Sequence, residues 1–117
     1  MVADLNREGA ERVAAEINDA GGKAIAVQAD IANESSVAAM MEATKAAFGG
    51  LDILVNNAAL MIEAVGTPAI QTSIADFDRL MRVNLTGALI CSKAAASLFQ
   101  ERGGDFVGLG DEGDKQR

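Results

Sequence analysis

Polar side chains follow three short apolar stretches of this sequence, and these side chains are the ones most able to do chemistry. Asp4 follows the first stretch, Asp30 follows the stretch at residues 23–28, and Asn56-Asn57 follow the stretch at residues 51–55. The carboxyl ends of parallel strands meet at one edge of a sheet, and ligands of open α/β sheets bind at that edge. If the three stretches are parallel strands, their polar side chains gather around one binding site.

Each candidate group has both a binding role and a simpler local role. The Asp4 carboxylate can accept hydrogen bonds from both hydroxyls of a ribose and would repel a 2′-phosphate, so it favours NAD over NADP. Asp30 can accept from an adenine amine. Either carboxylate can instead cap a turn. The sequence Asn56-Asn57-Ala58-Ala59 combines two amides with two small residues, so it can admit a flat ligand close to the backbone or simply turn the chain.

Helical patterns separate the apolar stretches. Asn6 is a good N-cap for a helix with apolar residues at helical spacing, and Gly21-Gly22 end it. Asn33 similarly begins a second helix, which Gly49-Gly50 end. The run at residues 51–55 lies between two helical patterns, so we predict a central parallel strand, although a buried helical turn has a similar pattern.

A long helix is predicted after a loop at residues 60–72. Ser73 caps it, Asp76 stands at the reach-back position of a capping box, and an apolar stripe continues to about residue 102. Gly87 is a candidate for a bend. Asn84 lies near the apolar face and needs a partner, either a backbone carbonyl or a water of the site. A strand at residues 105–109 and a polar, disordered tail at residues 110–117 complete the prediction.

Composition excludes several classes of function. The chain has 117 residues and a net charge of −7, which argues against binding nucleic acid. No apolar stretch is long enough to span a bilayer, and no secretory signal is evident, so no membrane is expected as a partner. The absence of histidine removes histidine-based triads and metal sites. The single cysteine, Cys91, fits a reducing cytoplasm and is expected to be a buried structural thiol.

The alternation of strands and helices predicts an α/β fold, a Rossmann-like doubly wound parallel sheet. Residues 1–109 would form a partial NAD-binding domain, followed by the tail. With Asn56-Asn57-Ala58-Ala59 after an apolar strand and Asn84 within Val83-Asn84-Leu85-Thr86-Gly87, the sequence resembles the classical short-chain dehydrogenase/reductase family from about residue 1 to residue 104. Ala59 departs from the glycine that the family usually has there.

The resemblance implies a role for each candidate residue. Asp4 would bind the adenosine ribose of NAD, and Asp30 with the backbone of Ile31 would bind the adenine. Asn57, Ala58 and Ala59 would line the cofactor, while Asn56 would brace the sheet. Asn84 matches the asparagine of the family's catalytic tetrad, which helps to hold a water in the proton relay. The helix at about 73–102 resembles the one that pairs subunits, so a homo-oligomer is implied, with Ala94 to Ser97 suited to close packing. The substrate would be a small alcohol or carbonyl compound.

Three parts of the family pattern are absent from these 117 residues. The Gly-rich phosphate loop would lie before Met1. The central first strand of the family's sheet is missing with it, so the strands ending at Asp4 and Val55 lose their shared neighbour. The chain has no tyrosine, so it lacks the family's Tyr-x-x-x-Lys, and Gly110 and Asp111 stand where its catalytic serine is expected. We therefore expect a truncated oxidoreductase, with the central first strand and the C-terminal half missing, that is inactive as written.

Two alternatives to that expectation stay open. The chain can be a non-catalytic module that binds a nucleotide or pairs with a full-length relative. It can also be an unstable pseudogene product.

Overall fold

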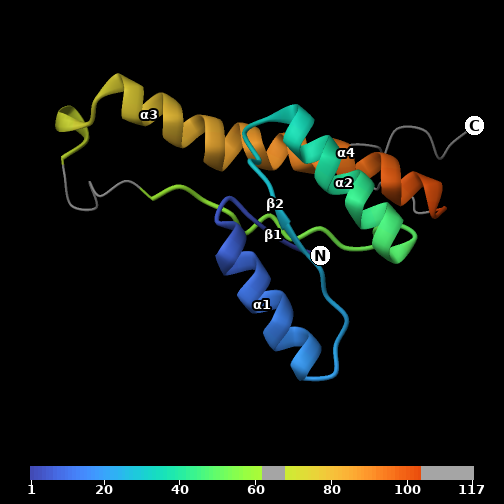
Figure 1. Ribbon diagram of the computed structural model, residues 1–117. Coiled ribbons are helices and arrows are strands. Elements are labelled where there is room, and N and C mark those ends of the chain that lie inside the picture. Colours follow the sequence, from blue (N-terminus) through green and yellow to red (C-terminus); the bar gives the residue numbers. More distant parts are fainter. Residues whose placement is uncertain (62–67, 104–117) are drawn as a thin grey trace, which may run out of the picture.

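The computed structural model describes residues 1–61 and 68–103, and all structural statements concern these residues. The elements in chain order are β1 (Val2–Asp4), α1 (Arg7–Asp19), β2 (Ala26–Gln28), α2 (Glu34–Phe48), the short 3₁₀ helix η1 (Ala69–Gln71), α3 (Ile74–Met81), the π-helical segment η2 (Arg82–Gly87) and α4 (Ala88–Glu101). Figure 1 shows their arrangement. The predicted strand at residues 105–109 and the predicted tail at 110–117 lie outside the described residues.

The fold is α/β with a small parallel sheet, as the sequence predicts. β1 and β2 pair in parallel, with Val2 opposite Ala26 and Asp4 opposite Gln28. In Figure 1, α1 lies on one side of these strands, and α2 and α4 lie together on the other side. Parallel strands need a crossover between them, and here α1 supplies it. The result is the beginning of a doubly wound sheet, which is incomplete within the described residues.

The three predicted N-caps are confirmed. The Asn6 side chain accepts a hydrogen bond from the Gly9 N–H at 3.1 Å, and Asn33 accepts from the Ser36 N–H at 3.0 Å. Ser73 Oγ accepts from the Asp76 N–H at 3.1 Å and donates to the Asp76 carboxylate at 2.7 Å. These side chains satisfy backbone donors that have no partner inside the helix, so the sequence sets the helix starts locally.

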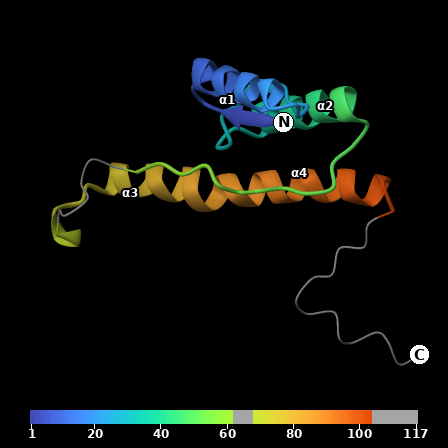
Figure 2. The ribbon, with the colours of Figure 1, turned by 90° about the horizontal axis from the view of Figure 1, so that it is seen from below.

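The prediction of a central strand at residues 51–55 is wrong. The segment is extended in Figures 1 and 2 but pairs with neither β1 nor β2, and the sheet has two strands only among the described residues. Ile53 is 77% exposed and Val55 is 76% exposed. A strand needs a hydrogen-bonded neighbour on at least one edge, and none of the described residues pairs with the backbone of residues 51–54. β2 is also shorter than the predicted stretch at residues 23–28.

The long helix predicted from Ser73 is continuous through α3, η2 and α4, and it contains a π-helical segment rather than a simple bend at Gly87. Gly87 is buried and lies against Ile31: a Cβ added at Gly87 would stand 2.9 Å from Ile31 Cγ1. The glycine therefore allows the helix to approach the turn that follows β2. None of the described helices is long and apolar enough to cross a membrane.

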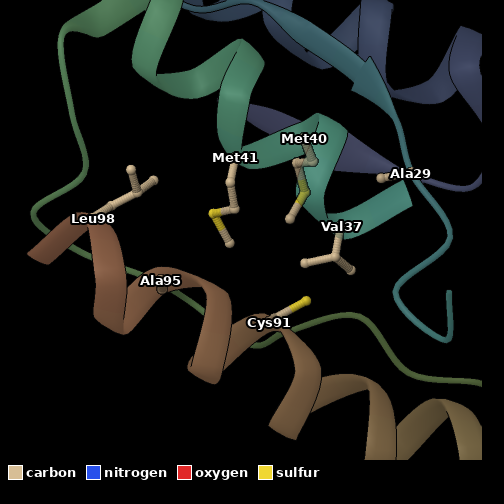
Figure 3. Close-up of a cluster of buried hydrophobic side chains, with 7 residues drawn as sticks. All are labelled: Ala29, Val37, Met40, Met41, Cys91, Ala95 and Leu98. Carbon is tan, nitrogen blue, oxygen red and sulfur yellow. The ribbon is translucent and has the colours of Figure 1, made fainter. Parts of the chain in front are cut away.

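The core lies between α2 and α4 rather than on the sheet. Figure 3 shows the buried side chains of α2, of α4 and of the residue that follows β2 gathered in one cluster: Val37, Met40, Met41, Cys91, Ala95, Leu98 and Ala29. The prediction that Cys91 is a buried structural thiol is confirmed. Ala95 is fully buried in this core, so it is not free to pack against another subunit. The α2–α4 pair thus holds residues 51–58 beside the sheet.

Candidate functional site

A cavity of about 490 Å³ lies between β1 and residues 50–58. Ala3 and Asp4 line it from one side, and Leu51 to Ala58 line it from the other. Its remaining walls come from the α2 face that carries Met40 and Met41 and from Cys91 on α4. Four of the predicted site residues meet at this cavity, namely Asp4, Ile31, Asn57 and Ala58. Asp30, Ala59 and Asn84 do not line it.

Asp4 combines a capping contact with a potential ligand contact. Its Oδ1 accepts a hydrogen bond from the Asn6 N–H at 2.8 Å, which is the local role that an aspartate after a strand commonly has. Among residues 1–61 and 68–103, no group donates to its other carboxylate oxygen. Gln28 holds the backbone here by donating to the Leu5 carbonyl at 3.1 Å. The carboxylate is exposed beside the cavity, so it can bind a ligand there.

The turn after β2 is fixed by hydrogen bonds to two other elements. Asp30 Oδ1 accepts from the Ala32 N–H at 2.9 Å, and the Asp30 N–H donates to Ser36 Oγ of α2 at 2.9 Å. Arg82 donates to the Ala32 carbonyl at 2.6 Å. Ile31 is thereby held at the cavity wall. The Asp30 side chain serves the turn, which is the simpler of its two predicted roles.

Residues 56–59 continue the extended segment and are tied to α4 through Asn56. The Asn57 N–H donates to the Val55 carbonyl at 3.1 Å. Asn56 Nδ2 donates to Ser92 Oγ at 3.1 Å, and Ser92 Oγ donates in turn to the Ala88 carbonyl at 2.8 Å. Asn56 therefore anchors the extended segment to the helix rather than bracing a sheet. Asn57 and Ala58, which follow Asn56 in this segment, thereby line the cavity.

Asn84 bonds the backbone of Leu60 through both ends of its amide. Its Oδ1 accepts from the Leu60 N–H at 2.6 Å, and its Nδ2 donates to the Leu60 carbonyl at 2.9 Å. Asn84 lies inside the π-helical segment η2, Arg82–Gly87. Such segments are rare and frequently occur at functional sites. Of the two partners predicted for Asn84, a backbone carbonyl or a water, the structure has the backbone, and the contact fixes the chain just after Ala59.

The electrostatics of the site leave few groups for acid–base chemistry. Burial raises the pKa of the Cys91 thiol above its ordinary value, so the thiol stays protonated at neutral pH and is a poor nucleophile. Within the part of the chain that the structure describes, no group of three or more His, Cys, Asp or Glu side chains could hold a metal ion.

Sequence reasoning did not find three of the groups that build this site. Ser92 is 36 positions from Asn56, and the backbone of Leu60 is 24 positions from Asn84. Arg82 reaches Ala32 across 50 positions. No local pattern marks a hydrogen bond across such separations. At Asn84, a polar residue on an apolar helical face indicates that a partner is needed, but the sequence does not name that partner.

Comparison with known proteins decides the family. The sequence pattern of the family described as enoyl-(acyl carrier protein) reductase matches residues 1–115. This chain belongs to the short-chain dehydrogenase/reductase family. It is 41% identical over 116 residues to the uncharacterized oxidoreductase YuxG of Bacillus subtilis, a match that covers 96% of the chain.

Two further relatives have more specific names. The chain is 43% identical over 102 residues, 87% of its length, to the 2,5-dichloro-2,5-cyclohexadiene-1,4-diol dehydrogenase of Sphingobium indicum. It is 42% identical over 108 residues, 84% of its length, to an NADPH-dependent aldehyde reductase-like chloroplastic protein of Arabidopsis thaliana. The matches cover 16% of the Bacillus protein, 39% of the Sphingobium protein and 40% of the Arabidopsis protein. This short-chain dehydrogenase/reductase chain thus spans less than half the length of these relatives.

Proposed function

We propose that this chain is the part of a short-chain dehydrogenase/reductase that binds the adenosine end of NAD, in an oxidoreductase that interconverts an alcohol and a carbonyl compound. The single observation that carries the proposal is the cavity where Asp4, Ile31, Asn57 and Ala58 meet. These residues come from the ends of β1, β2 and the extended segment at 51–55. A site at the carboxyl ends of these segments is where an α/β sheet binds its ligand.

The residues present fit the adenosine part of the cofactor. The cavity volume of about 490 Å³ lies within the range of roughly 300–1,000 Å³ that is typical of small-molecule sites. Asp4 would hold the ribose hydroxyls through the carboxylate oxygen that does not cap the Asn6 N–H. Ile31 would cover the adenine, with its backbone and Asp30 beside it. Asn57, Ala58 and Ala59 would line the path toward the nicotinamide.

Asp4 favours NAD because its charge opposes a 2′-phosphate. The name of the Arabidopsis relative points to NADPH, so the choice between the two cofactors is the finer part of the proposal. When bound, the nicotinamide ring would supply or accept the hydride. The described residues offer no Gly-rich turn at a helix N-terminus for the pyrophosphate, so the chain alone would bind the whole cofactor weakly.

Asn84 would act as a positioning residue in the complete enzyme. Both ends of its side chain are occupied by Leu60, so it fixes the backbone that follows the cofactor-lining residues. With no tyrosine in its 117 residues, the chain has no phenol to donate a proton to a carbonyl oxygen. We therefore propose that it binds adenosine but does not turn over substrate. A reducing cytoplasm is the proposed compartment, since the chain has one cysteine.

We also propose that the long helix mediates self-association. Ile74, Phe77, Met81, Leu85 and Leu89 are exposed at helical spacing along α3, η2 and the start of α4. They form one apolar stripe and precede the small residues at 94–97, where Ala95 is buried in the core. Sedimentation of the wild-type chain and of Leu85→Glu tests this. The substituted chain should be monomeric where the wild type is not, and equal sedimentation of the two would contradict it.

The cofactor proposal is tested by amide chemical shifts of the 117-residue chain during titration with adenosine, NAD and, as a control, uridine. Adenosine and NAD should shift the amides of Asp4, Ile31, Asn57 and Ala58, while uridine should not. No shift at these amides, or equal shifts with uridine, would contradict the proposal. Formation of NADH from NAD and an alcohol by the purified chain would contradict its inactivity.

A further inference from the structure

The π-helical segment η2 contacts two separate parts of the candidate site. Arg82, its first residue, donates from Nη2 to the Ala32 carbonyl at 2.6 Å. Asn84 bonds the N–H and the carbonyl of Leu60. Side chains two positions apart on a helix do not share a face, so Arg82 and Asn84 reach in different directions. One short helical segment therefore joins the turn after β2 to the end of the extended segment.

The contact between η2 and the turn after β2 involves a second residue, Gly87. A Cβ added at Gly87 would stand 2.9 Å from Ile31 Cγ1 and 3.3 Å from the Ile31 carbonyl oxygen. In Figure 1 the turn between β2 and α2 lies over the middle of the long helix, where η2 connects α3 to α4. Ile31 and Ala32 are consecutive, so η2 contacts this turn at two adjacent residues.

The π-helical geometry of η2 explains how residues five positions apart contact the same turn. In an α-helix, positions i and i+5 point about 140° apart around the axis, because each residue turns by about 100°. In a π-helix the hydrogen bond joins positions i and i+5, which places them one turn apart on one face. Arg82 and Gly87 are the first and last residues of η2. The wider turn therefore directs both residues toward Ile31 and Ala32.

The opposite side of the turn is fixed by α2. The Asp30 N–H donates to Ser36 Oγ, and the Ala32 N–H donates to Asp30 Oδ1, each at 2.9 Å. Ala32 thus has its N–H bonded within the turn and its carbonyl bonded by Arg82. Ile31 lies between Asp30 and Ala32 and lines the cavity. The position of Ile31 at the cavity wall therefore depends on the bond from Arg82.

We propose that Arg82 is a positioning residue for the adenine of the cofactor, acting through the Ala32 carbonyl to hold Ile31 against the base. The inference rests on the proposed function, in which Ile31 covers the adenine. Arg82 is not among the residues that line the cavity, so its action on the base is indirect. A guanidinium suits this role because a charged donor makes a stronger hydrogen bond than a neutral one. Arg82 is exposed, so water competes for the bond and the effect is moderate.

The test compares Arg82→Met with Arg82→Lys in the 117-residue chain. Methionine removes the donor and lysine keeps a charged donor, while arginine, methionine and lysine have similar helix propensities. Arg79→Met makes the same change at an exposed position one turn earlier, in α3, and serves as the control. Circular dichroism establishes that each variant is folded. If Arg82→Met does not fold, Arg82→Gln, whose shorter side chain does not reach as far, takes its place.

Titration with adenosine gives two readouts by nuclear magnetic resonance. Amide chemical shifts give the affinity, and the nuclear Overhauser effect between adenine protons and the Ile31 methyl groups reports the contact with the base. Arg82→Met should bind adenosine about three- to fivefold more weakly than the wild type and should lose the Overhauser effect. The Asp4 amide should still shift, because it belongs to the ribose end. Arg82→Lys should regain the Overhauser effect, and Arg79→Met should match the wild type.

A purely structural role for Arg82 would give a different pattern. A variant that only lowers the folded fraction loses the shifts of Asp4 and Ile31 in the same proportion, and the molecules that bind keep the Overhauser effect. That pattern would overturn the inference, as would an equal loss in Arg79→Met or no recovery in Arg82→Lys. Wild-type affinity in Arg82→Met would overturn the inference and leave the proposed function standing. No adenosine binding by the wild type would overturn both.

Discussion

The Asn84 side chain forms two hydrogen bonds with the backbone of Leu60, accepting from its N–H at 2.6 Å and donating to its carbonyl at 2.9 Å. A neighbouring strand would pair with both groups of a residue in the same way. The two residues are 24 positions apart, and the contact joins the π-helical segment η2 to the end of the extended segment. It fixes the backbone next to Asn57, Ala58 and Ala59, which we propose to line the cofactor, although no sheet holds this segment. The consequence is that a helix side chain, rather than a strand ladder, sets the position of the proposed binding loop.

Replacing Asn84 should loosen that loop. Asn84→Ala removes both hydrogen bonds, so we expect a loss of about 1–2 kcal/mol in the free energy of unfolding and faster exchange of the Leu60 amide. Urea denaturation and amide hydrogen exchange measure the two effects. Asn84→Asp keeps the acceptor for the Leu60 N–H but loses the donor to the Leu60 carbonyl. The Leu60 amide should therefore exchange more slowly in Asn84→Asp than in Asn84→Ala. Unchanged exchange in both variants would show that the contact does not hold the loop.

Gly87 should not tolerate a side chain, although it lies in a helix. A Cβ there would stand 2.9 Å from Ile31 Cγ1 and 3.3 Å from the Ile31 carbonyl oxygen. The resulting strain of about 1–3 kcal/mol outweighs a helix-propensity gain of up to about 1 kcal/mol, so Gly87→Ala should lower the free energy of unfolding. Thermal denaturation with a reversible baseline measures it.

Gly9 offers a matched control for that substitution. A Cβ at Gly9 would meet only the Asn6 side chain, at 3.5 Å or more, which is an ordinary contact. Gly9→Ala should therefore stabilise the chain by about 0.5–1 kcal/mol. A stabilising Gly87→Ala would contradict the close approach of η2 to the turn after β2.

The stability of the chain should fall at alkaline pH because of Cys91. Burial raises the pKa of this thiol in the folded state, so the folded state favours the protonated form. The contribution is fully present below the pKa of the unfolded thiol, about 8.5, and is lost as pH rises through the folded pKa. Urea midpoints of the wild type and of Cys91→Ala from pH 7 to 10 give the comparison. The wild type should lose more stability than the variant over that range, and parallel curves would contradict the assignment.

Local chemistry made much of this fold predictable. Asn6, Asn33 and Ser73 mark three helix starts correctly because each cap is satisfied by a backbone donor three residues further along the chain. The parallel pairing of β1 with β2 follows from the crossover helix between them. The sequence also predicted that Asp4, Asp30 and Asn56-Asn57 gather around one site. Asp4 and Asn56-Asn57 do line one cavity, but Asp30 does not.

The segment at residues 51–55 shows where such reasoning fails. Its composition is that of a central strand, but a strand is defined by its neighbours, and no described residue pairs with its backbone at 51–54. The core formed between α2 and α4 instead, around side chains such as Val37 and Ala95. Likewise, no local pattern predicts that Ser92 binds Asn56 or that Arg82 binds Ala32, because these contacts depend on how the helices pack.

The central claim is that Asp4 holds the ribose of NAD, and one measurement tests it most directly. Calorimetric titration of NAD and of NADP into the wild type, Asp4→Asn and Asp19→Asn gives a ratio of affinities for each chain. Asp4→Asn keeps an oxygen for the Asn6 N–H but loses the charge, and Asp19→Asn makes the same change at the exposed end of α1. The wild type and Asp19→Asn should prefer NAD by about tenfold, and Asp4→Asn should bind the two cofactors about equally. The same ratio in all three chains, or no NAD binding by the wild type, would contradict the claim.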